Sequence, residues 1–267
     1  MTFPVRLEVF GTSWHPHFIF EVAASVAAVV LYFILRHRAG RTPFPPETIL
    51  GLICGCLFGA WIGSKLLLVL GSPRQFLTLH GQIQGLAEGK TTVGALLGGW
   101  AGIEIVKRML RLHTPTGEFL VYPLALAIAI GRLGCFLSGL PDHTHGVASS
   151  LPWAVDFGDG VRRHPSQIYE AIYVLLLAVV VHRFAGGRMG SPAEIFRRFL
   201  AGYFLFRVVA DFLKPRASIL LSLDATQMVS TLAVVVLAWP RQGPTPGAIS
   251  NSMSKPVPQA QPSEDPL

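Results

Sequence analysis

Charged side chains are scarce in this sequence. Asp, Glu, Lys and Arg make up 14% of the 267 residues, whereas about 25% is usual in soluble domains. Hydrophobic residues account for 51%. So few charges on so much apolar surface exclude an ordinary soluble globular domain. The composition indicates a membrane protein, in which one helical bundle accounts for most of the length.

Cysteine is also rare, and acidic residues are fewer than basic ones. Cys54, Cys56 and Cys135 all lie in apolar runs, without the spacing of a disulfide framework or a zinc site. We interpret Cys54 and Cys56 as buried structural thiols. The net charge is +7, but the basic residues lie mainly between apolar runs. Membrane topology and anionic headgroups explain them there, so we expect membrane lipid and no nucleic acid as a partner.

Long apolar runs recur along the chain, each close to the roughly 20 residues that cross a bilayer as a helix. They lie at about His17–Leu35, Thr48–Leu70, Thr92–Leu110, Phe119–Leu140, Pro165–Phe184, Ile195–Leu213 and Ile219–Trp239. We therefore expect an all-α integral membrane fold over residues 1–239. It would be a seven-transmembrane-helix bundle with a polar periplasmic loop between helices 4 and 5.

The two ends of the chain differ from the bundle. The N-terminus lacks the pattern of a cleavable signal peptide. Residues 240–267 are rich in Pro, Gln, Ser and Gly, which predicts a disordered cytoplasmic tail. With the N-terminus outside, the inner loops carry more Lys and Arg than the outer loops, including Arg36, Arg38 and Arg41. This bias favours a periplasmic N-terminus and a cytoplasmic C-terminus.

Several charged residues fall inside the predicted spans. In the expected topology Lys65, Arg132, Arg207, Glu21, Glu170 and Asp211 all lie in the outer half of the bilayer. Such residues normally face the protein interior and mark functional sites. Arg132 and Arg207 carry donor forks that suit a lipid phosphate. The alternative is that Arg132–Glu170 and Arg207–Asp211 ion pairs only hold the bundle together.

Two further patterns have structural and functional interpretations. Glycines at every fourth position, Gly51 to Gly63 and Gly94 to Gly102, predict close packing of the second and third spans. The loop after the fourth span carries His143, His145 and His164, which are candidates for proton transfer near neutral pH. His143 and His145 alone are a weak metal signal, and His164-Pro165 also fits a helix start.

Four blocks of sequence carry a resemblance to a known family. They are Gly131-Arg132-Leu133-Gly134-x-Phe136, His164-Pro165-Ser166-Gln167-Ile168-Tyr169-Glu170, Gly202-Tyr203-x-x-x-Arg207-x-x-x-Asp211-Phe212, and Gln227 in the last span. In this order they resemble the bacterial prolipoprotein diacylglyceryl transferase family. The resemblance implies an inner-membrane enzyme with no metal or organic cofactor. It would move diacylglyceryl from phosphatidylglycerol to the lipobox cysteine thiol in the signal peptide of a lipoprotein precursor.

The resemblance also implies a set of site residues. Arg132, Arg207 and Glu170 match catalytic positions. Substrate-binding positions are expected at Lys65, Tyr169, Tyr203, Asp211, His164, Gln227 and Cys135. Asp211 stands where the family usually has Glu, and Lys65 stands where it tends to have Arg. For Tyr169 and Tyr203, an interfacial anchor is the simpler interpretation.

Two stretches depart from the family pattern. Val93-Gly94-Ala95 replaces His-Gly-Gly, and Gly134 to Leu140 lacks the family's two Asn residues and Glu. Without that His, the base that activates the thiol is open between His143, His145, Glu170 and bulk hydroxide. Two alternatives follow: a divergent paralogue that uses another acceptor, and a non-catalytic protein that binds anionic lipid. A transporter would show an internal repeat or a broken helix pair, and neither is evident.

Overall fold

The computed structural model describes residues 3–5, 7–9, 12–40, 44–87, 91–112, 117–185, 192–214 and 223–239, and over these the protein is mostly helical. The predicted tail, 240–267, lies outside the described residues, as do residues 219–222 of the predicted last span. The chain divides into two units, Met1–Leu237 and Ala238–Leu267. The fold and the site described below belong to the first unit.

Each predicted span has a helix in the structure. These helices are α1 (Pro16–Arg38), α2 (Pro46–Gly71), α4 (Thr92–Met109), α5 (Val121–Ser138), α6 (Ser166–Ala185), α7 (Pro192–Ala210) and α8 (Ala225–Ala238). A further short helix, α3 (Leu79–Ala87), was not predicted. Within the described residues, α1, α2, α5 and α6 are long and apolar enough to cross a membrane, and α8 is apolar but shorter.

Elements of two to five residues lie before and between the helices, so the protein is mostly helical but not all-α. Strands β1 (Leu7–Val9) and β2 (Thr12–Trp14) form an antiparallel pair, as do β3 (Val155–Asp156) and β4 (Arg162–Arg163). Short 3-10 helices are η1 (Pro73–Leu77), η2 (Glu118–Leu120), η3 (Leu140–Asp142) and η4 (Asp211–Leu213). The polar loop before α6 is therefore ordered, with β3 and β4 inside it.

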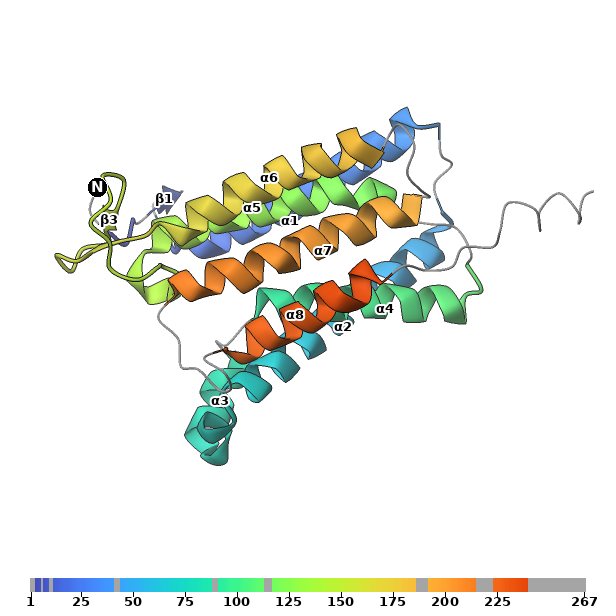
Figure 1. Ribbon diagram of the computed structural model, residues 1–267. Helices are drawn as coiled ribbons and strands as arrows, with labels where there is room; N and C mark the ends of the chain where they lie inside the picture. The colour runs from blue at the N-terminus through green and yellow to red at the C-terminus, as the bar shows by residue number, and fades with distance from the viewer. Residues whose placement is uncertain are drawn as a thin grey trace, which may run out of the picture. The chain divides into compact units, whose positions relative to one another are not determined.

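Two sets of helices pack along their lengths. Helix α1 contacts α5, α5 contacts α6, and α6 contacts α7, so these four lie side by side (Figure 1). Helix α2 packs against α4. The most deeply buried aromatic side chains, Phe199, Tyr203 and Phe204, all belong to α7. The core therefore lies around α7, which also carries the embedded charge of Arg207.

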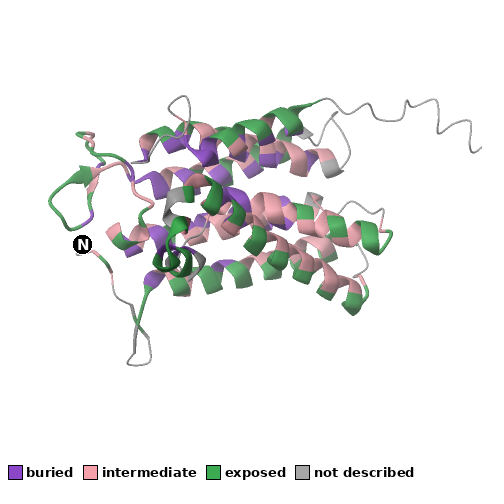
Figure 2. Ribbon diagram, turned by 90° about the horizontal axis from the view of Figure 1, so that it is seen from below, coloured by how far each residue is buried: buried purple, intermediate pink, exposed green. Residues whose placement is uncertain are grey.

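The outward faces of the helices are apolar. Figure 2 shows exposed positions along the outer sides of the helices and buried positions on the sides that meet their neighbours. On α2 the exposed side chains include Leu57, Phe58 and Trp61, each more than half exposed. A water-soluble monomer rarely exposes a continuous apolar surface of this kind. This arrangement fits helices that face lipid.

The glycine ladders bring α2 and α4 into backbone contact. A Cβ added at Gly59 would collide with the carbonyl oxygen of Gly98, and one added at Gly98 would collide with that of Gly59. The same reciprocal relation joins Gly63 to Gly94 and Gly55 to Gly102. The close packing predicted from the four-residue spacing is confirmed.

We expect Gly98→Ala to destabilise the protein by about 1–3 kcal/mol, because the added methyl group would force two backbones apart. Gly131→Ala is the matched control, since a Cβ at this helical glycine of α5 meets nothing within 4 Å. Thermal denaturation of the two variants in detergent measures the difference. Equal midpoints for both variants would show that the α2–α4 contact does not depend on the missing side chains.

Candidate functional site

A single carboxylate joins the two embedded arginines. Glu170 lies in the second turn of α6 and is 2% exposed. One of its oxygens, Oε1, lies 2.9 Å from the guanidinium of Arg132, and Oε2 lies 2.8 Å from that of Arg207. The hydroxyl of Tyr203 also donates to Oε1, at 2.6 Å. Three helices, α5, α6 and α7, thus meet through one buried charged group.

The spacing on α7 explains why its residues reach the same place. Tyr203, Arg207 and Asp211 follow one another at intervals of four residues, which places them on one face of a helix. Asp211, the first residue of η4, forms an ion pair with Arg207, with 2.7 Å between its carboxylate oxygen and the guanidinium. Both ion pairs that the sequence offered as a purely structural alternative, Arg132–Glu170 and Arg207–Asp211, are therefore present.

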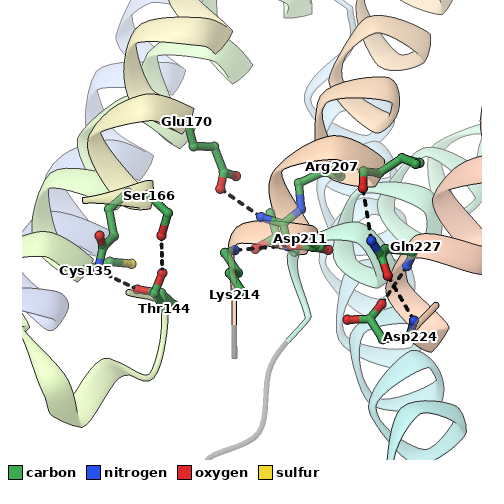
Figure 3. Close-up of polar contacts among 12 residues, drawn as sticks. Cys135, Thr144, Ser166, Glu170, Arg207, Asp211, Lys214, Asp224 and Gln227 are labelled. Carbon is green, nitrogen blue, oxygen red and sulfur yellow. Dashed lines mark hydrogen bonds and ion pairs between the residues drawn. The ribbon is translucent and has the colours of Figure 1, made fainter. Parts of the chain in front are cut away.

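The cluster has more positive than negative groups. Lys214, which follows η4, is buried, and its Nζ lies 3.5 Å from Asp211 (Figure 3). When Lys214 is protonated, these five groups contain three cations and two carboxylates. The Nε of Arg207 is buried, and it has no hydrogen-bond partner in the described part of the chain. An unbalanced positive charge and a spare donor suit an anionic ligand.

Lys214 gives this charge a pH dependence. Burial and the positive charge of Arg207 lower the pKa of Lys214 to about 7, although Glu170 and Asp211 oppose the shift. We expect the affinity for an anionic phospholipid to fall as the pH rises through about 7, because Lys214 then loses its proton. Lys214→Arg should remove this fall, since guanidinium stays charged over roughly pH 6 to 9.

Binding of an anionic phospholipid to the purified protein, measured across this pH range, tests the prediction. The histidines are common to both proteins, so the difference between the two curves isolates Lys214. The same decline in wild type and in Lys214→Arg would contradict the role of Lys214.

Arg132 has further contacts beside Glu170. Its guanidinium donates to the hydroxyl of Thr92 at 3.0 Å and to the thiol of Cys135 at 3.9 Å. Thr92 is the first residue of α4 and directly precedes Val93, which stands where the family pattern has His. The start of α4 therefore still gives Arg132 a polar partner, although the imidazole is missing.

The other predicted substrate-binding residues lie in different surroundings. The hydroxyl of Tyr169 accepts from the indole of Trp153 at 2.7 Å and lies 3.2 Å from Nδ1 of His164. Lys65 donates to the carbonyl of Gly85 in α3 at 3.2 Å. The structure thus brings Arg132, Arg207, Glu170, Tyr203 and Asp211 together, with Cys135 beside Arg132. Tyr169 and His164 instead contact each other, and Lys65 contacts α3.

Gln227 has a structural role at the start of α8. Its backbone N–H donates to the carboxylate of Asp224 at 2.7 Å, and its side-chain oxygen accepts from the backbone N–H of Asp224 at 3.0 Å. These reciprocal bonds form a capping box. The amide nitrogen of Gln227 also donates to the carbonyl of Val208 in α7. Figure 3 shows this group beside the Arg207 cluster.

Several residues of the site were not identified from the sequence. Lys214 was not singled out, although its spacing of three residues from Asp211 was a usable signal. Thr92 gave no signal. His17 and Asp142 also lie here: with Cys135 they form the group of three potential metal ligands found in the described residues.

The sequence is similar to known proteins. A family model described as prolipoprotein diacylglyceryl transferase matches residues 6–240. The phosphatidylglycerol–prolipoprotein diacylglyceryl transferase of Clostridium tetani is 25% identical over 249 residues, covering 87% of this chain and 94% of that protein. The protein of the same name from Geobacter sulfurreducens is 30% identical over 200 residues, covering 70% and 73%. That of Cupriavidus necator is 30% identical over 217 residues, covering 75% and 74%.

Proposed function

The chain belongs to the prolipoprotein diacylglyceryl transferase family, and on that premise we propose that it is the membrane transferase that modifies lipoprotein precursors. The lipid donor is phosphatidylglycerol. The acceptor is the lipobox cysteine in the signal peptide of a lipoprotein precursor. The products are a thioether-linked diacylglyceryl group and glycerol phosphate. The observation that carries this proposal is the buried pair of arginines joined by Glu170.

The proposed topology has seven membrane spans, α1, α2, α4, α5, α6, α7 and α8, in the bacterial inner membrane. The N-terminus and the loop before α6 are periplasmic, and the C-terminus is cytoplasmic. Basic residues in the last turns of α1 and α4, including Arg36, Arg38, Lys107 and Arg108, support this orientation. The arginine cluster then lies near the outer headgroups.

Arg132 and Arg207 are proposed to hold the phosphate of the lipid. The bond that breaks joins a glycerol carbon to a phosphate oxygen, so negative charge grows on the departing phosphate. Donors fixed beforehand around that charge stabilise the transition state more than the ground state. Because the guanidiniums are already oriented by Glu170, little reorganisation accompanies the reaction.

Glu170 is better suited to positioning than to proton transfer. Each of its oxygens meets a guanidinium, and Oε1 also accepts from Tyr203. A carboxylate held between two cations is a weak base. Of the bases considered for the acceptor thiol, Glu170 is therefore the least suited.

The experiment that tests the function is complementation of a bacterial strain depleted of its own transferase. We expect this chain to restore growth and to add the mass of a diacylglyceryl group to lipoprotein precursors, as measured by mass spectrometry. The variant Arg207→Gln serves as the inactive control. If precursors keep their unmodified mass while the protein is present in the membrane and binds phosphatidylglycerol, the non-catalytic lipid-binding alternative holds instead.

A further inference from the structure

A histidine, a cysteine and an aspartate from three separate elements meet beside Arg132. His17 is the second residue of α1, Cys135 lies in the last turn of α5, and Asp142 ends η3. The Nδ1 of His17 lies 3.8 Å from the sulfur of Cys135 and 3.2 Å from Oδ1 of Asp142. The three ligand atoms all lie within 4.8 Å of one another.

These distances match the edges of a tetrahedral metal site. With zinc–ligand bonds of about 2.0–2.3 Å, nitrogen and sulfur ligands stand about 3.6 Å apart, and nitrogen and oxygen ligands about 3.4 Å apart. Thiolate and imidazole ligands suit Zn²⁺ rather than Mg²⁺ or Ca²⁺, which prefer oxygen alone. We infer that His17, Cys135 and Asp142 bind Zn²⁺ and leave its fourth coordination position open for the acceptor thiol.

The surroundings of the ligands hold them in place. The hydroxyl of Thr144 donates to Oδ2 of Asp142, which leaves Oδ1 directed at His17. Thr144 is in turn held by the start of α6: Ser166 donates to its carbonyl at 2.7 Å, and Gln167 donates to its hydroxyl at 3.2 Å. Such outer hydrogen bonds orient metal ligands. They also explain why the polar side chains of Ser166 and Gln167 are buried, since both donate hydrogen bonds to Thr144.

The backbone and the second imidazole nitrogen contribute to the same arrangement. Gly139, between Cys135 and Asp142, has φ +69°, which lets the chain turn back so that the aspartate faces the thiol. On the other side of the His17 ring, Nε2 lies 3.7 Å from a carboxylate oxygen of Glu21. A carboxylate behind a ligating histidine is a common feature of zinc sites.

The position of Arg132 connects this site to the proposed reaction. Its guanidinium reaches both Glu170, at 2.9 Å, and the sulfur of Cys135, at 3.9 Å. The negative charges of the Cys135 thiolate and the Asp142 carboxylate balance the charge of Zn²⁺. The occupied site would therefore have no net charge beside the guanidinium of Arg132. An acceptor thiol on the open position would lie next to the lipid phosphate.

This use of the site rests on the proposed function. On binding Zn²⁺ the acceptor thiol releases its proton to water, because a coordinated thiol is deprotonated. The thiolate sulfur then attacks the glycerol carbon, and a carbon–sulfur bond forms. The carbon–oxygen bond to phosphate breaks, and its electron pair leaves with glycerol phosphate. The ion would thus activate the acceptor thiol in place of the imidazole base, which this chain lacks because Val93 stands at that position.

Metal binding is measured first, without lipid or precursor. Purified wild-type protein should bind about one Zn²⁺ per chain, and Co²⁺ in its place should give a thiolate-to-cobalt charge-transfer band. Cys135→Ser should lose the band and more than about 100-fold in Zn²⁺ affinity, whereas Thr144→Val should lose about 10- to 100-fold, as outer partners do. Cys56→Ser, on α2, is the matched control and should bind as wild type does.

Lipidation of a precursor peptide by the same preparation then separates the two claims. Loss of activity on removal of Zn²⁺, with recovery when Zn²⁺ is added back, would support the metal-bound thiol. Absence of stoichiometric Zn²⁺ binding, or unchanged binding in Cys135→Ser, would overturn the site. Full activity of the metal-free protein would overturn its part in the reaction. A protein that binds Zn²⁺ through Cys135 and transfers no lipid would keep the site and reject the proposed function.

Discussion

Glu170→Ala should lower the free energy of unfolding by about 3–5 kcal/mol, because it leaves buried guanidinium groups without their carboxylate. Arg132 and Arg207 both depend on Glu170, and it is almost completely buried. Arg207 would keep Asp211, but among the described residues Arg132 would keep only Thr92 and the weak contact to Cys135. Reversible unfolding of the purified protein in detergent measures the loss.

The chain offers a matched control for this prediction. Glu104 also pairs with a cation, Lys107 at 3.0 Å, but its side chain is 41% exposed. Glu104→Ala should therefore change stability by no more than about 1 kcal/mol, as exposed pairs do. Glu170→Gln would keep the side-chain volume and lose the charge, so its free energy of unfolding should be closer to that of Glu170→Ala than to that of Glu104→Ala. A Glu170→Ala protein as stable as Glu104→Ala would show that the arginines find other partners.

Arg207→Gln should reduce lipidation about 10²- to 10³-fold, the loss typical for removal of one preorganised donor. The fold should survive, because each carboxylate keeps a cation: Glu170 keeps Arg132, and Asp211 keeps Lys214. Arg132→Gln should have an effect of similar size. Phosphatidylglycerol-dependent modification of a lipobox peptide, followed by mass, measures the rate.

Two further variants define what the arginine supplies. Arg207→Lys keeps the charge but loses the planar fork, so its rate should fall between wild type and Arg207→Gln. Arg163→Gln is the control, because Arg163 pairs with Asp159 on the loop between β3 and β4. It should stay within a few-fold of wild type. Activity of Arg207→Gln in that same range would reject Arg207 as a catalytic residue.

Much of the site was predictable because a charge inside an apolar run is conspicuous. Arg132, Glu170 and Arg207 each interrupt such a run. Because successive spans cross the membrane in opposite directions, the sequence predicted that all three lie at a similar depth. The four-residue spacing from Tyr203 to Asp211 predicted their common face. The glycine ladders likewise predicted the contact of α2 with α4, since backbone approach follows directly from missing side chains.

The partners of these charges were less predictable. Glu170 joins residues of α5 and α7, and the apolar surroundings of α6 do not indicate which way the carboxylate turns. Lys214 follows the last turn of η4, so only the structure showed that it is buried. His17 lies 118 residues before Cys135, and the three ligands belong to three elements, so no spacing rule connects them.

The position of a bound lipid tests the central claim most directly. We would determine an experimental structure of the protein in a bilayer with phosphatidylglycerol as the anionic lipid. The account predicts the lipid phosphate about 3 Å from the guanidiniums of both Arg132 and Arg207, with Glu170 still between them. A phosphate held elsewhere, with both arginines occupied only by Glu170 and Asp211, would contradict it.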